Sequence, residues 1–147
     1  MFKNDETKAT GKLTVEIKDK HGRVKDTREV KNLVVDTGLA FIASRMKDAT
    51  ATAMSHMGIG TGNTAAAAGD TSLGTEAARV SLTSTTVTSN AVAYVASFAA
   101  GTGTGAITEA GILNGASGGT LLCRTVFSVV NKAASDSMTI TWTVTIS

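Results

Sequence analysis

The clearest pattern of hydrophobic and polar residues lies near the end of the printed chain, over residues 137–147. Four threonines alternate there with larger apolar residues, namely Met138, Ile140, Trp142, Val144 and Ile146. Strict alternation with β-branched residues is typical of a strand that buries one face. Residues 120–130 are apolar on both parities instead, which predicts a central strand covered on both faces.

A second alternating pattern, over residues 12–35, predicts a charged β-hairpin with one face in water. Leu13, Val15 and Ile17 alternate with polar residues, and the turn that follows contains Gly22, which can supply a positive φ. The return run has candidate inward residues at Val24, Val30, Leu33 and Val35. Residues 1–11 lack apolar periodicity and are expected to form a flexible arm.

The period changes over residues 37–47, where a short amphipathic helix is predicted. Its expected apolar stripe has the spacing i, i+3, i+4, i+7 and consists of Leu39, Ile42, Ala43 and Met46. Asp36 or Thr37 can cap the start of such a helix by accepting a backbone N–H. Arg45 and Lys47 would lie in its last turn, where cations suit the helix dipole.

Strand signals return over residues 54–147, which we expect to form a β body continuous with the hairpin in one domain, residues 12–147. Glycine-rich turns at residues 101–105 and 114–119 separate the runs. About eight strands and one helix are expected, with strands following strands along the chain. This order favours a mainly β fold, an antiparallel β-sandwich of jelly-roll-like type with one short α-helix.

Charge is distributed unevenly along the 147 residues, which include 24 threonines, 15 glycines and no proline. Residues 1–48 carry 19 of the 26 charged side chains, and residues 49–147 carry seven. Two interpretations are open. The β body has a polar, uncharged surface of threonine and serine, or it packs against other protein, since interface cores are depleted of charge.

The same composition argues against several classes of function. A net charge of +2 is small for an electrostatic binder of nucleic acid, and no apolar run reaches the length of a membrane span. His21, His56 and Cys123 do not have the spacing of a metal site. The glycine runs GIGTG (58–62) and GTGTG (101–105) do not have the form of a P-loop, and we interpret both as turn glycines. We therefore expect no catalytic residue, metal, cofactor or small-molecule substrate, and a buried structural role for Cys123.

Several short phrases, in order, resemble small structural proteins of tailed bacteriophages. They are NLVVDTGLAFIASRM (32–46), MGIGTGNT (57–64), DTSLGTEAAR (70–79), ITEAGILN (107–114), LLCRTVFSVVNK (121–132) and TITWTVTI (139–146). The resemblance covers about residues 30–147, and the group includes head decoration (cement) proteins and tail-fibre or appendage proteins. It implies a virion structural role and brings no catalytic residues with it.

The leading hypothesis is a decoration protein that binds the outer surface of the assembled head and bridges capsid subunits. Its expected partners are the major capsid protein and further copies of itself, as a dimer or trimer. The resemblance implies synthesis in the host cytoplasm. The N-terminal residues contain no apolar stretch like that of a secretory signal, and the single Cys123 fits synthesis in a reducing compartment. The candidate contact residues are Phe2, Lys3, Lys8 and Lys12.

Two alternatives stay open. A tail-fibre or baseplate appendage protein would share the same composition, although a fibre shaft normally requires length or repeats. A carbohydrate-binding β-sandwich module would need exposed aromatic faces, whereas Trp142 lies on the apolar parity of its strand and Tyr94 is the one tyrosine.

Overall fold

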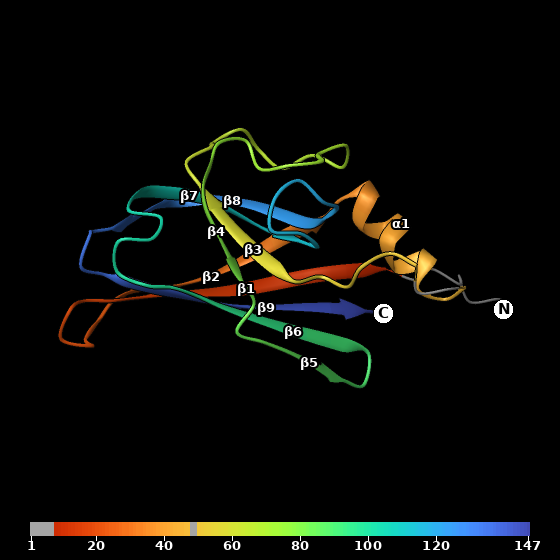
Figure 1. Cartoon of the computed structure of the whole chain (residues 1–147), viewed down its shortest axis with the longest axis horizontal. Coiled ribbons are helices and arrows are strands. Elements are labelled where there is room, and N and C mark those ends of the chain that lie inside the picture. Colours follow the sequence, from red (N-terminus) through yellow and green to blue (C-terminus); the bar gives the residue numbers. More distant parts are fainter. Residues whose placement is uncertain (1–7, 48–49) are drawn as a thin grey trace, which may run out of the picture.

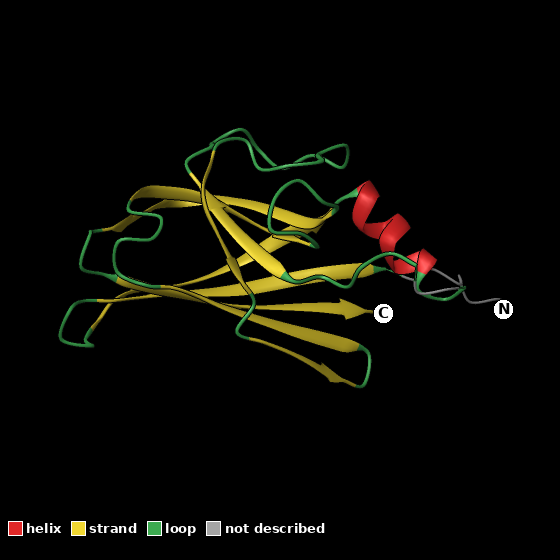
Figure 2. Cartoon of the chain, in the orientation of Figure 1, coloured by secondary structure: helices red, strands yellow, loops and turns green. Residues whose placement is uncertain are grey.

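The structure is a computed structural model that describes residues 8–47 and 50–147. Its elements are β1 (Ala9–Lys18), β2 (Val24–Val34), α1 (Asp36–Ser44), β3 (His56–Gly60), β4 (Glu76–Ser81), β5 (Ser84–Thr88), β6 (Ala91–Phe98), β7 (Gly105–Leu113), β8 (Leu121–Lys132) and β9 (Ser137–Ile146). All the strand pairs are antiparallel. The predicted mainly β fold with one short helix is confirmed (Figure 2).

The strands form one sheet in the order β4-β3-β7-β8-β2-β1-β9-β6-β5, which curls into a half-barrel (Figure 1). Strand β2 makes the bend, because most of it pairs with β1 while its last residues, Leu33 and Val34, pair with β8. We call β2-β1-β9-β6-β5 the lower half and β4-β3-β7-β8 the upper half, as they lie in Figure 1. On the side of the half-barrel opposite this bend lie the two edge strands, β4 and β5. They follow each other in the chain and are joined by the two residues Leu82 and Thr83.

The core lies between the two halves and is made by the apolar residues that alternate along one side of each strand. Trp142 is fully buried, as its place in the alternating pattern predicts, and it lies opposite Leu13 in the β1–β9 pair. Phe98 and Met57 are also fully buried, from the lower and upper halves respectively. Large aromatic and apolar side chains supply most of the free energy of such a core, about 1.5–3 kcal/mol each.

The helix differs from its prediction in boundary, cap and buried face. It ends at Ser44, its N-cap is Val35 with no side-chain cap hydrogen bond, and Thr37 Oγ1 instead donates to the carbonyl of Leu121 at 2.8 Å. Leu39 is 46% exposed, Met46 is 87% exposed and Ala43 is exposed as well, so the predicted stripe is wrong at three of its four positions. The helix buries Gly38 and packs Phe41 and Ile42 against the core, because its close approach to β8 turns that side inward.

The hairpin forms as predicted, with Gly22 at a φ of +78° in its turn. Strand β1 begins at Ala9, inside the expected arm, and residues 1–7 lie outside the described residues. Val24 and Leu33 are exposed rather than inward. Leu33 lies on the same outward side of β2 as Glu29 and Lys31, and the register shift between Ile17 and Lys18 places Val24 opposite the exposed Lys18. The start of β8, residues 121–125, is buried on both faces, as its apolar pattern predicts.

Gly38 sets how closely α1 approaches β8, since a Cβ there would overlap the carbonyl oxygen of Leu122. We expect Gly38→Ala to lower the free energy of unfolding by about 1–3 kcal/mol, because the helix must move away from the strand. Chemical denaturation monitored by circular dichroism measures this change. The matched control is Gly69→Ala, where a Cβ meets nothing within 4 Å and a change below about 0.5 kcal/mol is expected. Equal stabilities for the two variants would contradict the proposed contact.

Candidate binding surface

Most of the charged residues of the β body are buried, and this decides the character of its surface. Glu109, Arg124, Lys132 and Asp136 are at most 3% exposed. The side chain of Arg79 is 10% exposed, and those of Asp70 and Glu76 are 25% and 31% exposed. The seven charges of residues 49–147 therefore contribute little to the exposed surface, which is even poorer in charge than the sequence indicates.

Glu109 is the centre of one buried network, on the outer side of the upper half. Its Oε2 accepts hydrogen bonds from the backbone N–H groups of Gly62 and Thr75, and its Oε1 accepts one from Gly74, each at 2.7 Å. Arg124 Nε donates to Oε1 as well, at 3.1 Å. A single carboxylate thereby holds both ends of the 61–75 loop against β7 and β8.

Arg124 extends this network into the middle of the same loop. Its Nη1 donates to Asp70 Oδ2 at 2.9 Å, and its Nη2 donates to the carbonyl of Thr64 at 3.0 Å. Asp70 also accepts a hydrogen bond from the backbone N–H of Ala67. The loop is thus closed over the pair of opposite charges, which excludes water from both.

Close approach, rather than a turn, explains two glycines of the GIGTG run. Gly60 is the last residue of β3, and Gly62 lies two residues further along the chain. A Cβ on Gly60 would overlap the carbonyl oxygen of Thr75, and a Cβ on Gly62 would overlap Glu109 Oε2. The interpretation of this run as turn glycines is therefore wrong, since neither residue has a positive φ and both make room for the network.

Hydrogen bonding controls the ionisation of the carboxylates in the network. Burial alone would raise the pKa of Glu109, but the N–H groups of Thr75, Gly74 and Gly62, together with Arg124, hold that pKa below its ordinary value. The pKa of Asp70 is also lowered, first by the backbone hydrogen bond from Ala67 and then by Arg124. Both groups therefore remain ionised at neutral pH and serve as fixed acceptors.

A second buried ionic group closes the far end of the half-barrel. Asp136 accepts hydrogen bonds from Lys25 Nζ and from the backbone N–H of Ala133, and these interactions lower its pKa. Lys132 Nζ donates to the carbonyl of Ala99 at 2.9 Å, and burial lowers the pKa of this lysine. The group connects β2, the 133–136 turn and the residue after β6.

The residues considered for chemistry do not converge on one site. Cys123 is fully buried, and burial raises the pKa of its thiol well above the ordinary value. His56 Nδ1 lies 2.7 Å from Ser55 Oγ, and its Nε2 lies 3.4 Å from Ser81 Oγ, whereas His21 is in the exposed hairpin turn. Among the described residues, no group of three or more His, Cys, Asp or Glu side chains could hold a metal ion.

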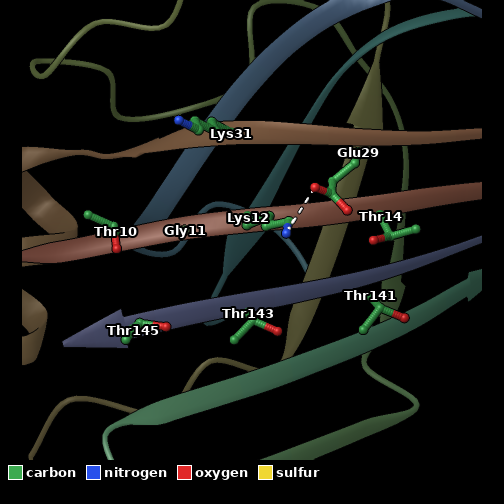
Figure 3. A pocket seen from close by; sticks show the side chains of 9 residues that line it. All are labelled: Thr10, Gly11, Lys12, Thr14, Glu29, Lys31, Thr141, Thr143 and Thr145. Atoms are coloured by element: carbon green, nitrogen blue, oxygen red, sulfur yellow. Dashed lines mark ion pairs between the residues drawn. The ribbon is translucent and has the colours of Figure 1, made fainter. Parts of the chain in front are cut away.

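The outer face of the lower half carries a shallow groove of about 750 Å³ (Figure 3). Threonines of β1 and β9 project from it in register, with Thr10 opposite Thr145 and Thr14 opposite Thr141. The groove is lined by Thr10, Gly11, Lys12, Thr14, Glu29, Lys31, Thr141, Thr143 and Thr145. We call this surface the threonine face. Its hydroxyl and methyl groups can donate, accept and pack without the cost of removing a charge from water.

One of the candidate contact residues lies on the threonine face. Lys12 projects from β1 and forms an ion pair with Glu29 at 2.9 Å, drawn as a dashed line in Figure 3. Lys8 is exposed beside the start of β1, where its backbone pairs with Ser147. Phe2 and Lys3 lie outside the described residues. The sequence did not point to the threonines of β1 and β9 as a site, although their alternation was visible.

A second hollow, of about 320 Å³, lies between α1 and the inner side of the lower half. Its lining is mainly apolar and includes Phe41, Ile42, Met54, Tyr94 and Val144. Burial there raises the pKa of Tyr94 to about 12, so its hydroxyl stays protonated at neutral pH. This hollow is an opening of the core at the helix end of the half-barrel.

No protein-family model, no curated protein and no solved structure matches the chain. In the described part of the chain, none of the helices is long and apolar enough to span a membrane.

Glu109→Gln tests the buried network. The substitution leaves Arg124 buried without its charged partner, so we expect the free energy of unfolding at pH 7 to fall by about 3 kcal/mol. Because the pKa of Glu109 is lower in the folded protein, its contribution is present above the ordinary value of 4.5 and is lost as the pH falls through the lowered value. The variant should therefore lose less stability than the wild type over that acid range.

Denaturation with urea at a series of pH values measures both effects. The control is Glu29→Gln, which removes an exposed ion pair with Lys12 and should change stability by at most about 1 kcal/mol. A Glu109→Gln variant as stable as this control would contradict the role of the network.

Proposed function

We propose that this protein is a capsid decoration protein of a tailed bacteriophage and that it acts at the outer surface of the virion. In this role it binds the assembled head and bridges neighbouring subunits of the major capsid protein, and it works by binding rather than by catalysis. The observation that carries the proposal is the nearly uncharged exposed surface of residues 50–147, which includes the outer faces of β6 and β9. Depletion of charge is a property of the buried centres of protein interfaces.

The resemblance to phage structural proteins supports this role through particular residues. The sequence phrases on which the resemblance rests contain residues of the buried network. These are Gly62 in MGIGTGNT, Asp70 and Gly74 in DTSLGTEAAR, Glu109 in ITEAGILN, and Arg124 in LLCRTVFSVVNK. These residues hold the 61–75 loop on the upper half. The resemblance therefore concerns how the β body is built, and its last phrase, TITWTVTI, also contains the β9 threonines of the threonine face.

In this role the protein would stabilise the capsid shell through its binding equilibrium. A protein that binds the assembled head and not its separate subunits stabilises the head in proportion to its occupancy. The threonine face suits a flat docking contact, because its hydroxyl groups can pair with backbone groups of the capsid. Lys12, in the middle of the groove, already has an ion-pair partner in Glu29 (Figure 3). Repeated binding across a symmetric shell adds avidity.

The tail-appendage alternative uses the same surfaces and differs in location and copy number. Copies in proportion to the capsid subunits of a purified virion support the head, and a few copies per virion support the tail. The carbohydrate-binding alternative has no support from the two aromatic residues that it would use, because Trp142 is fully buried and Tyr94 is 8% exposed.

Binding to expanded heads of the parent phage tests the proposal. The wild-type protein should bind in fixed proportion to the capsid subunits and raise the temperature at which the heads disrupt, as measured by cosedimentation and calorimetry. Thr141→Lys places a charge at an exposed position of the threonine face, and we expect it to weaken binding by about tenfold or more. Ser117→Lys makes the same change of charge in the exposed 114–119 turn and should bind as the wild type does.

Absence of binding by the wild-type protein would refute the head proposal. Equal loss of binding in both lysine variants would show that the threonine face is not the contact.

A further inference from the structure

The free edge of β5 has none of the features that normally protect a strand edge. Each residue of the strand, Ser84–Thr88, is exposed, and Val87 is 71% exposed. Its pairing with β6 is regular, without a bulge, and within residues 8–47 and 50–147 β6 is its one neighbour in the sheet (Figure 1). The sequence holds no charged residue and no proline from Val80 to Thr108. Edges of this kind, without a charge, proline or bulge, readily pair with another strand.

The opposite edge of the same sheet, β4, is protected in two ways. Its pairing with β3 is interrupted between Ile59 and Gly60, which is a bulge. It also carries an ion pair between Glu76 and Arg79 at 2.7 Å, and Arg79 Nη1 donates to the carbonyls of Gly115 and Gly118. Charges and bulges on an edge strand oppose the addition of a further strand.

We propose that β5 is a self-association edge, at which two copies of this chain pair antiparallel about a two-fold axis. The occupant is a second copy because one edge is open and the other is protected. Pairing of two open β5 edges uses up both, so the assembly closes at two chains. An open β4 would instead allow head-to-tail addition without limit.

The sequence of β5 is self-complementary in this arrangement. Full overlap of the strand with its copy places Thr86 opposite Thr86, Thr85 opposite Val87, and Ser84 opposite Thr88. Each cross-strand pair joins neutral residues, and all but the Ser84–Thr88 pair join β-branched ones, a combination that stabilises paired strands. No charge is brought next to a like charge, and the exposed Val87 gains a neighbour on the inner side.

The pairing would extend the lower half of one chain into that of the other. A two-fold axis perpendicular to the sheet keeps the outer sides of both copies on the same side, so the two threonine faces become parts of one continuous surface. This inference concerns the isolated protein and does not depend on the proposed function. The two can therefore fail separately.

Cross-linking through an introduced cysteine tests the axis directly. In Thr86→Cys, the two thiols would face each other across the axis with Cα atoms roughly 4.5–5.5 Å apart, a distance that a disulfide can span. Mild oxidation should convert most of the full-length variant into a covalent dimer of twice the 14.9 kDa mass. The native thiol, Cys123, is buried and should not react in the folded protein.

The matched control is Ser97→Cys, at an exposed position on the outer side of β6. In the proposed dimer the two copies of this residue are three strand spacings apart across the sheet, about 14 Å, and are also offset along the strands, so no covalent dimer should form. Sedimentation velocity of the wild type should show dimers, and Thr86→Lys should shift the protein to monomers while its circular dichroism stays unchanged, because two like charges meet at the axis.

Three results would overturn the proposal. They are a wild-type protein that is monomeric at its highest soluble concentration, a trimer or larger ring, and a dimer in which Thr86→Cys cross-links no better than Ser97→Cys. Loss of the dimer without loss of head binding, or the reverse, separates this inference from the proposed function.

Discussion

The buried carboxylate of Glu109 and the guanidinium of Arg124 form the interaction on which the upper half of the fold depends. Neither charge could remain buried without the other, and neither would be satisfied without the backbone groups of the 61–75 loop. The loop has no regular structure of its own, so the carboxylate replaces a strand or helix as its support. The ionic contact therefore organises this segment together with the buried side chain of Leu73 and two further hydrogen bonds, from Thr108 Oγ1 to the carbonyl of Gly62 and from the Asp36 N–H to the carbonyl of Ala68.

Burial of these charges also leaves the exposed surface of the β body with little charge. The chain keeps charged residues in its β body but uses them internally, at Glu109–Arg124 and at Lys132 and Asp136. The exposed surface of that body is left to threonine, serine, alanine and glycine, while most of the exposed charge belongs to the N-terminal hairpin. A surface of this kind can be covered by protein with little loss of hydration of charges, which is the basis of the proposed β5 pairing and of the β9 side of the proposed head contact.

The regular parts of this fold could be predicted from sequence, and the network could not. The alternation around Trp142 predicts both the strand and its buried side, because a period of two depends on local geometry alone. The helix stripe fails at Leu39 and Met46, because the approach of Gly38 to β8 is a tertiary contact that overrides local amphipathicity. The pairing of Glu109 with Arg124 depends on a register shift in the β7–β8 pair, and no local sequence pattern predicts that shift. Gly60 and Gly62 allow the loop and Glu109 to approach the backbone closely, but in a sequence such glycines cannot be distinguished from glycines of turns.

Hydrogen exchange of the backbone amides of Gly62, Gly74 and Thr75 tests most directly whether Glu109 holds the loop. In the wild-type protein at neutral pH we expect these three amides to exchange as slowly as those at the centre of β7, because each donates to a buried carboxylate. Other amides of the 61–75 loop that face solvent should exchange fast and serve as an internal reference. Exchange of the three amides as fast as that reference would contradict the account, since the loop would then be open in solution.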